Sequence, residues 1–475
     1  MFGKAIVAAA VLALGAGPVQ AAVEKQRLFV LTDIEADPDD SMSLVRLLLY
    51  SNEIDIEGLV ATTSTHQKTF VAPETIRRIV GAYGEVQPNL LKHEKGFPEA
   101  KALLGLISEG LPVYGMAGVG EGKDSAGSDR LIRALETSDP RPLWVTAWGG
   151  TNTLAQALWR IRQSKSPEEA KRLIAKLRVY TISDQDDSGI WIRTNFPEVS
   201  YIVSPGGYSV GVWTGILSEE AGFDNSEISN GWIAEHIQQG HGPLGAQYPD
   251  VGYGMEGDTP SYLALIPNGL NAPDHPDWGG WGGRYRLAIP KLADLDPKGF
   301  TGGVPVGEEP RPIWTNSADS YTPYVANDIG KSVKLFDKTV KSARVTVWRW
   351  RKDFQNDFAA RMDWTVKPYA EANHPPVVSL GQPDHITVKS GAGFHLSATG
   401  SDPDGDNLSY LWFNYPEAGT LDQPIPIPGA ENLYRVPVTA PVVTKTEMAH
   451  FIVKVTDKGT PPLTRYGRVI VTIEP

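Results

Sequence analysis

The sequence contains no cysteine and is short of basic residues. Because none of its 475 residues is Cys, disulfide bonds, thiolate metal sites and cysteine nucleophiles are excluded. Lys and Arg number 44 against 56 Asp and Glu, and the resulting net charge of −12 repels nucleic acid backbones and anionic membrane surfaces. We therefore expect no nucleic acid partner. Any bound metal must be held by oxygen or His ligands.

Long apolar runs are also scarce. The run from Ala5 to Gly17 follows Lys4 and precedes the small-residue pattern Val19-Gln-Ala21, which is typical of a secretory signal peptide over residues 1–21. It is shorter than the roughly 20 residues that a membrane-spanning helix needs. The sequence thus predicts export to the periplasm or outside the cell, and no membrane span.

What the chain does contain is a regular alternation of strand and helix patterns after the leader. Strand-helix-strand order predicts a doubly wound, mostly parallel α/β sheet, in a domain that covers residues 22–371 with a loop-rich extension. Further on, short alternating runs separated by turn residues predict an immunoglobulin-like β-sandwich over residues 372–475. Between these regions, Trp348-Arg-Trp-Arg351 alternates like a strand and predicts packing between the domains. The strands expected in the α/β domain are 27–32, 56–61, 143–146, 177–182 and 199–203, with helices at 41–50, 72–83 and 152–162.

The segment that follows the first predicted strand is unusually acidic. Asp33, Glu35, Asp37, Asp39 and Asp40 lie where that strand ends and a helix begins, which is the edge where parallel sheets bind ligands. Carboxylates so close together repel one another, and a divalent cation such as Ca²⁺, which prefers hard oxygen ligands, would stabilise them. The alternative is that one carboxylate caps the helix and the others are solvated.

Three segments of the chain resemble motifs of the nucleoside hydrolases. Asp33-Ile-Glu-Ala-Asp-Pro-Asp-Asp40 is similar to their opening Asp-x-Asp-Pro-Gly-x-Asp-Asp signature, which holds Ca²⁺. Trp148-Gly-Gly-Thr-Asn-Thr-Leu-Ala155 is similar to their Gly-Pro-Leu-Thr-Asn-x-Ala turn, and Glu256-Gly-Asp-Thr-Pro260 stands in the place of their late His-Asp pair. The three matches occur in the family's order.

This resemblance implies a site. Asp33, Asp40, Asp258 and the backbone carbonyl of Thr151 would bind Ca²⁺. Asp33 would also be the general base, and Asp39 would hold a sugar hydroxyl. Further substrate contacts are expected from Asn152 in the second motif, from Glu256 in the third, and from Asn195 in Arg193-Thr-Asn195, which echoes the family's sugar-holding Glu-x-Asn segment.

The sequence also departs from the nucleoside hydrolase pattern. Glu35 stands where the second Asp of the signature belongs, and Ala36-Asp37 replaces Pro-Gly, so Glu35 is a candidate to compete for the metal. The late His has no counterpart before Asp258. The identity of the general acid therefore stays open.

Another segment, Asp277 to Tyr285, sets Trp278, Trp281 and Arg284 among glycines. Two indoles in such a loop can form a flat wall against the apolar face of a sugar, while the guanidinium binds its hydroxyls. The alternative is that these aromatic side chains anchor the loop in the core.

Nearly the whole chain after the leader resembles a second, more specific family. Ser41-Met-Ser-Leu-Val-Arg-Leu-Leu-Leu-Tyr50, Trp278-Gly-Gly-Trp-Gly-Gly-Arg284 and Ala372-Asn-His-Pro-Pro376 carry this likeness. It is a family of exported bacterial proteins in which a nucleoside-hydrolase-like domain is joined to a β-sandwich, and which is described as cellulose-binding. The resemblance implies a link to carbohydrate.

Together these features predict an exported, Ca²⁺-dependent glycoside hydrolase that acts on a carbohydrate. Asp33 would activate water for attack on the anomeric carbon. One alternative is a carbohydrate-binding protein that has lost its reaction, in keeping with the missing late His. Another is an exported nucleoside hydrolase that releases free base. The sequence does not indicate an oligomeric state.

Overall fold

The computed structural model describes residues 24–206, 208, 210–220, 223–291, 304, 307–326, 333–335 and 338–475. The expected signal peptide lies outside these residues. Of the helices within them, none is long and apolar enough to cross a membrane.

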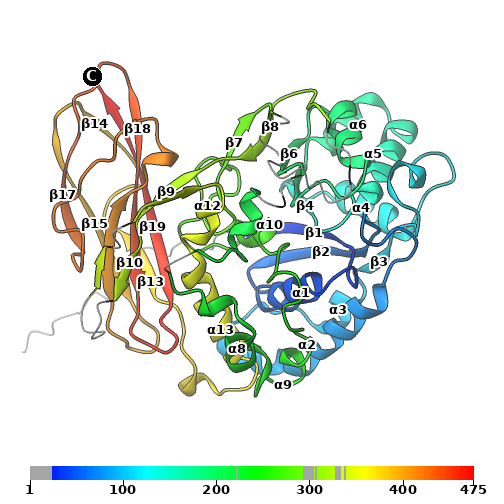
Figure 1. The fold of residues 1–475 in the computed structure, drawn as a ribbon, viewed down its shortest axis with the longest axis horizontal. Helices are drawn as coiled ribbons and strands as arrows, with labels where there is room; N and C mark the ends of the chain where they lie inside the picture. The colour runs from blue at the N-terminus through cyan, green and yellow to red at the C-terminus, as the bar shows by residue number, and fades with distance from the viewer. Residues whose placement is uncertain are drawn as a thin grey trace, which may run out of the picture.

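An eight-stranded sheet forms the centre of the first domain (Figure 1). Its strand order is β3-β2-β1-β4-β5-β6-β8-β7, and neighbouring strands are parallel except for β7 against β8. The doubly wound, mostly parallel sheet predicted from the sequence is thus confirmed. The strands are β1 (Gln26–Thr32), β2 (Ile54–Ala61), β3 (Ile107–Glu109), β4 (Leu143–Ala147), β5 (Leu177–Thr181), β6 (Ser200–Val203), β7 (Tyr285–Ala288) and β8 (Ile313–Asn316).

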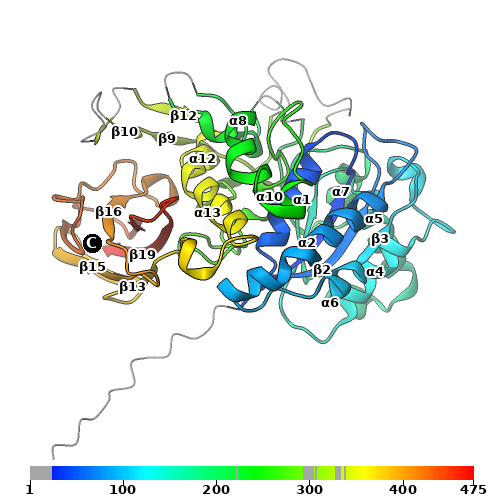
Figure 2. The same cartoon turned by 90° about the horizontal axis from the view of Figure 1, so that it is seen from below.

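Helices cover both faces of this sheet (Figures 1 and 2). Along β1, Leu28 and Val30 join the cluster formed with α1, α2 and α13 (Arg351–Asp363), whereas Phe29 and Leu31 join the cluster formed with α4, α5 and α6. Burial on both faces explains why β1 is a continuous apolar run. The helices of the domain are α1 (Asp39–Leu49), α2 (Pro73–His93), α3 (Ala100–Leu104), α4 (Ala126–Glu136), α5 (Asn152–Ser164), α6 (Pro167–Ile174), α7 (Ser188–Asn195), α8 (Asn230–Ile233), α9 (Gly242–Gly245) and α10 (Pro260–Leu263).

The sheet reverses its direction of growth between β1 and β4. The chain proceeds from β1 to β2 and β3 on one side, and from β4 to β5 and β6 on the other. At such a switch point the loops after adjacent strands part and leave a crevice at the carboxyl ends of the strands. The loop that carries Asp33 and the loop that carries Trp148 begin at this crevice.

The second domain is a β-sandwich, as predicted. One sheet has the order β13-β15-β17 and the other β14-β19-β18-β16, and side chains such as Trp412, Phe451 and Val471 pack between them. The strands are β13 (Val377–Leu380), β14 (His385–Lys389), β15 (Gly393–Ser401), β16 (Ser409–Asn414), β17 (Arg435–Thr439), β18 (Glu447–Thr456) and β19 (Thr464–Glu474).

Two helices, α12 (Val345–Trp348) and α13 (Arg351–Asp363), lie between the sheet and the sandwich (Figures 1 and 2). The strand predicted for residues 348–351 is therefore wrong, because its short alternation belongs to the end of one helix and the start of the next. The predicted packing between domains is confirmed, since the ring of Trp350 contacts Tyr415 and Tyr466 of the sandwich. The short strands of the extension are β9 (Asp319–Tyr321), β10 (Tyr324–Ala326), β11 (Val333–Leu335) and β12 (Val340–Ser342).

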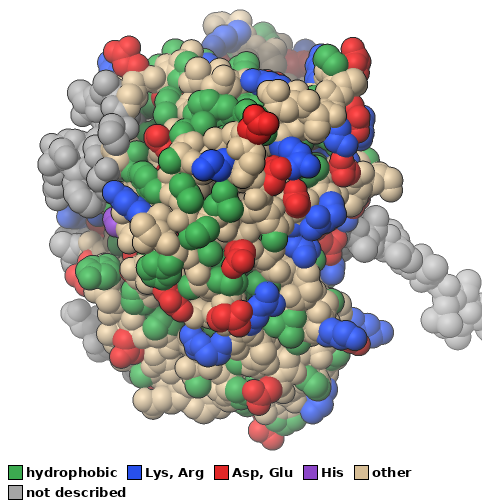
Figure 3. Space-filling model, turned by 90° about the vertical axis from the view of Figure 1, so that its right-hand side faces the viewer, with side chains coloured by type: hydrophobic (Ala, Val, Ile, Leu, Met, Phe, Trp, Pro, Cys, Tyr) green, Lys and Arg blue, Asp and Glu red, His purple; other side chains and the backbone are tan. Residues whose placement is uncertain are grey.

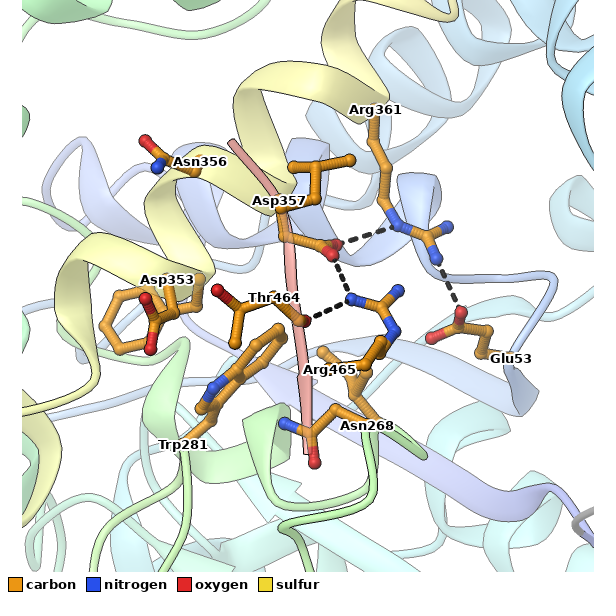
Figure 4. A network of polar contacts seen from close by, with 12 residues as sticks. Glu53, Asn268, Trp281, Asp353, Asn356, Asp357, Arg361, Thr464 and Arg465 are labelled. Atoms are coloured by element: carbon orange, nitrogen blue, oxygen red, sulfur yellow. Dashed lines mark hydrogen bonds and ion pairs between the residues drawn. The ribbon is translucent and has the colours of Figure 1, made fainter. Parts of the chain in front are cut away.

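Ion pairs join α13 to both domains (Figure 4). Asp357 accepts from Arg465 of β19 at 2.6 Å and from Arg361 at 3.2 Å, and Arg361 also pairs with Glu53 at 2.5 Å. Asp353 pairs with Lys454 of β18 at 2.6 Å. Because charges removed from water need partners, these contacts hold the sandwich in a defined position against the first domain.

The face of the first domain away from the sandwich has a mixed charge. Figure 3 shows Lys and Arg interspersed with Asp and Glu there, rather than gathered into one basic area among the coloured side chains. This part of the surface offers no polyanion a concentrated positive field.

Candidate functional site

A cavity of about 200 Å³ opens at the switch point of the sheet. Asp33 reaches it from the end of β1, Asp39 and Asp40 from the first turn of α1, and Asp258 from the turn before α10. We call it the acidic cavity, after its five acidic lining residues Asp33, Asp37, Asp39, Asp40 and Asp258. The structure therefore brings together four of the residues predicted as a site, from segments more than 200 positions apart.

Burial and mutual repulsion disfavour the charged forms of these carboxyls. Burial raises the pKa of Asp33 to about 7, and the neighbouring Asp37 adds to the rise. The pKa values of Asp39, Asp40 and Asp258 are also raised well above the usual range, first by burial and then by the other acids of the cavity. Raised carboxyl pKa values in a cleft are characteristic of functional sites.

The acidic cavity fits a divalent cation. One carboxylate oxygen from each of Asp37, Asp39 and Asp40 lies within 4.8 Å of the others. Oδ2 of Asp258 is buried without a hydrogen-bond partner. Crowded oxygens and an unpartnered buried carboxylate are the donor set that Ca²⁺ prefers. Asp37, to which the sequence assigned no role, belongs to the closest group.

Two glycines let the backbone approach these carboxylates. A Cβ atom on Gly149 would lie 2.7 Å from Oδ1 of Asp33, and one on Gly257 would lie 2.7 Å from Oδ2 of Asp39. The Trp148-Gly-Gly motif thus brings the loop after β4 against Asp33.

Three non-glycine residues in the described part of the chain have positive φ. Two of them, Glu35 (84°) and Glu256 (51°), lie within two residues of acids that line the cavity. Such strain is commonly stored at functional sites.

Glu35 and Thr151 do not reach the acidic cavity. Glu35 is exposed and its carboxylate accepts a hydrogen bond from the hydroxyl of Thr75, so it does not compete for a cation there. The carbonyl of Thr151 accepts the first helical hydrogen bond of α5 from Ala155 at 2.9 Å, and its hydroxyl contacts Ser188 at 2.7 Å. Thr151 is absent from the residues that line the acidic cavity, and its role as a metal ligand stays a prediction.

The polar residues expected to bind substrate have structural partners instead. Asn152 donates to the carbonyl of Val113 at 2.7 Å, and Asn195, at the end of α7, donates to the carbonyl of Trp191 at 2.9 Å. Glu256 is fully buried and pairs with Arg46 of α1 at 2.5 Å. None of these three lines the acidic cavity. Glu256 acts on the site indirectly, because its ion pair fixes the turn that carries Asp258.

The aromatic loop does not line the acidic cavity either. Trp281 is 0% exposed and packs against Phe354 and Tyr466, which leaves no ring face for a sugar. Arg284 pairs with Asp319 at 2.7 Å. For these two residues the alternative of anchoring in the core is correct, because contacts distant in sequence occupy them. Trp278 is half-buried at the boundary with the sandwich.

Other residues at the acidic cavity escaped sequence reasoning. His66, after β2, lines it and lies 3.2 Å from the hydroxyl of Tyr208. Trp213 lines the wall, with its buried Nε1 unpartnered, and Tyr253 is 90% exposed among the lining residues. His66 follows the end of a parallel strand, and this position could have predicted it as a site residue. Trp213 and Tyr253 lie in irregular segments, where no sequence pattern indicates a place at the cavity.

Fold and site together define a nucleoside-hydrolase-like α/β protein with a C-terminal β-sandwich. The chain belongs to the family described as cellulose-binding Sde182, nucleoside hydrolase-like domain, which it matches over residues 27–285. Residues 393–473 match the C-terminal domain described for the cellulose-binding protein Sde0182. The membership expected from the sequence is confirmed.

Among solved structures, one similar protein spans nearly the whole chain. It is described as a nucleoside hydrolase-related hypothetical protein from Saccharophagus degradans that is associated with carbohydrate metabolism. It is 34% identical, with a TM-score of 0.77, and the match covers 95% of this chain and 100% of that one. The effector protein XOO4466 is 10% identical over 61% of this chain and 87% of its own, with a TM-score of 0.33, too distant to inform function. No curated protein matches the chain significantly.

Proposed function

We propose that this protein is an exported, Ca²⁺-dependent hydrolase of glycosidic bonds in a carbohydrate, and that the reaction takes place in the acidic cavity. The observation that carries the proposal is the set of buried, mutually repelling carboxylates at the switch point of a nucleoside-hydrolase-like sheet. The link to carbohydrate is supported by the descriptions of the family and of the Saccharophagus degradans protein.

Asp40 and Asp258 are the proposed cation ligands, together with Asp33 and with Asp37 from the closest oxygen group. When bound, Ca²⁺ would supply positive charge that offsets their repulsion and favours oxygen ligands such as sugar hydroxyls and water. Asp39, which is half-buried at the start of α1 and lines the acidic cavity, is the proposed partner of a sugar hydroxyl.

Asp33 is the proposed general base. Asp33 lines the acidic cavity from the end of β1, where its carboxylate could accept a proton from a bound water. The water would then attack the anomeric carbon as oxocarbenium character develops. Gly149 holds the loop after β4 against this carboxylate, and so restricts its movement.

The leaving group would be protonated by His66, in hydrogen-bond contact with Tyr208. Their 3.2 Å contact lies at the acidic cavity, and a protonated imidazole is a common general acid toward a departing oxygen. His66 would thus supply the acid that the sequence lacks before Asp258. Trp213 and Tyr253 add aromatic surface of the kind that contacts the apolar faces of sugars.

The test is a hydrolysis assay over aryl glycosides, nucleosides and oligosaccharides, with Ca²⁺ or with EGTA. We expect sugar release from a glycoside with Ca²⁺, and a fall of roughly 10² to 10⁴ in turnover for Asp33→Asn. Glu35→Gln is the matched control, because this acid of the same segment faces away from the cavity, and its turnover should stay near wild type.

Two outcomes would contradict this proposal. Release of free base from nucleosides alone would identify an exported nucleoside hydrolase. Retention on cellulose with no turnover on any substrate would identify a binding protein, the alternative favoured by the family's description and by the missing late His.

Export is a separate part of the proposal. It rests on the apolar run and small-residue pattern of residues 1–21. Cell fractionation with N-terminal sequencing should find the protein outside the cytoplasm and beginning near residue 22. Intact protein that keeps Met1 and stays in the cytoplasm would contradict it.

A further inference from the structure

A second, larger cavity of about 660 Å³ lies between the two domains. One wall is the loop of residues 269–278, which precedes β7, and the other is formed by β13, β14 and β19 of the sandwich. We call it the seam groove. It shares no lining residue with the acidic cavity, and its volume is in the range of small-molecule sites.

The seam groove has an aromatic wall and an apolar floor. Trp278 lines it and is half-buried, with His275 stacked on its ring at 3.7 Å between centroids. Leu270, Leu380 and Ile470 add aliphatic surface. His275 covers one face of the indole and His450 packs against the ring at 4.9 Å, so only the part of Trp278 that lines the groove is open to a ligand. Together with the aliphatic side chains it forms an apolar surface that suits one face of a pyranose ring.

The polar groups of the groove suit hydroxyls. Gln382 accepts at Oε1 from the backbone of Ser397 at 2.8 Å, while its Nε2 is buried without a hydrogen-bond partner. An unsatisfied buried amide donor is costly, and an acceptor such as a hydroxyl oxygen would satisfy it. Asp384 and His385, 3.2 Å apart, lie on the rim with side chains 75% and 63% exposed.

The charges of the groove favour a neutral ligand. Arg468 lines it, but its guanidinium already donates to the carbonyls of Leu270, Trp278 and Gly279 and to Nδ1 of His450. Its donors are thus committed within the protein, and Asp384 on the rim repels anions. Of the ligands that combine a flat apolar face with many hydroxyls, a neutral glycan fits this surface.

We propose that the seam groove binds a neutral oligosaccharide, as a second site distinct from the acidic cavity and built jointly by the two domains. It shares with the proposed function only the link to carbohydrate. Its readout is binding, whereas that of the proposed function is turnover.

In the experiment, the full-length protein is titrated with cellohexaose, and binding is measured by calorimetry and by Trp fluorescence. Trp278→Ala should weaken binding by at least about tenfold, since an aromatic at the centre of a site commonly dominates affinity. The matched control is Trp232→Ala, because Trp232 is also half-buried and also contacts a His ring, that of His236 at 4.9 Å, away from the groove. It should bind as wild type does.

A second variant tests the groove without disturbing the packing between the two domains. Asp384→Ala combined with His385→Ala changes only exposed side chains, so the melting temperature should hold while affinity falls severalfold. Titration in EGTA, which removes the cation proposed for the acidic cavity, should leave cellohexaose binding to the groove unchanged.

The seam groove proposal would be overturned by wild-type affinity in both groove variants, by loss of binding in EGTA, or by no binding of cellohexaose to the wild type. Binding of a polyanionic glycan in place of the neutral one would also refute it, because the groove offers no free cation among its described residues.

Discussion

Asp258 is the residue whose surroundings depend most on a cation. The residue is 1% exposed, one carboxylate oxygen has no hydrogen-bond partner, and burial, followed by four neighbouring carboxyls, raises its pKa. A group so placed costs stability when it is charged alone. The group must therefore either be protonated or have its charge offset by another group.

Asp258→Asn should therefore act in opposite directions with and without Ca²⁺. In EGTA the variant should melt at a higher temperature than the wild type, because one of the repelling charges is gone. In Ca²⁺ the order should reverse, since the wild type gains more stability from a ligand that binds only the folded state. Scanning fluorimetry in both buffers measures this, with Glu35→Gln as the control. An equal gain from Ca²⁺ in both proteins would refute the ligand assignment.

Gly149 sets the position of the proposed base. The Cβ atom of Gly149→Ala would lie 2.7 Å from Asp33, so one of the two must move. We expect turnover to fall by about 10² or more, since small displacements of a reacting group are costly. Gly81→Ala, in α2, is the control, because no atom lies within 4 Å of its added Cβ. Wild-type turnover in Gly149→Ala would show that Asp33 is not held from this side.

At the scale of elements, an ion pair between Arg46 and Glu256 joins α1 to the turn before α10. Both side chains are fully buried and the contact is 2.5 Å. Each element supplies carboxylates to the acidic cavity, so the pair fixes their relative position. The backbone of Phe354 and the side chain of Gln355, both in α13, also accept from Arg46.

Glu256→Gln should be strongly destabilising, because it leaves the guanidinium of Arg46 buried without its counter-ion. The free energy of unfolding should fall by about 3–5 kcal/mol, measured by urea denaturation. Glu74→Gln, which breaks the exposed pair with Arg77, should change it by less than about 1 kcal/mol. A loss for Glu256→Gln no larger than that of this control would contradict the role given to the pair.

The sequence predicted the site best where local pattern and sheet topology coincide. Asp33 could be placed because a buried strand ends just before it, and ends of parallel strands share an edge. Trp281 and Arg284 could not, because their partners Tyr466 and Asp319 are far along the chain and only the folded structure brings them close. A Gly-rich loop has the same local pattern whether its aromatic side chains are exposed or anchored.

Across the whole molecule, contacts connect the sandwich to the acidic cavity. Arg465 of β19 pairs with Asp357 of α13, as Figure 4 shows. In the same helix, Gln355 accepts a hydrogen bond from Arg46. Arg46 in turn pairs with Glu256, which lies two residues before Asp258. The sandwich therefore supports the helix against which the site is built. Besides forming one wall of the seam groove, it stabilises the first domain.

His450 makes this junction of domains sensitive to acid. It lies on β18, is fully buried, and accepts a hydrogen bond at Nδ1 from Arg468 at 3.0 Å while its ring contacts Trp278. Burial, and then Arg468, lower its pKa to about 3. Above about pH 6.5 the imidazole is neutral in both the folded and the unfolded chain, so it adds no pH dependence there. Below that pH, the unfolded chain binds a proton that the folded protein does not bind, and the free energy of unfolding falls by up to about 1.4 kcal/mol per pH unit toward pH 3.

His450→Gln keeps an acceptor for Arg468 but cannot be protonated, so its melting temperature should fall less than that of the wild type between pH 7 and pH 4. His395→Gln, on an exposed position of β15, is the matched control and should follow the wild type. If His450→Gln showed the wild-type slope, the acid sensitivity of the junction would be assigned to Asp357, whose pKa Arg465 and Arg361 lower against the opposing effect of burial, rather than to this imidazole.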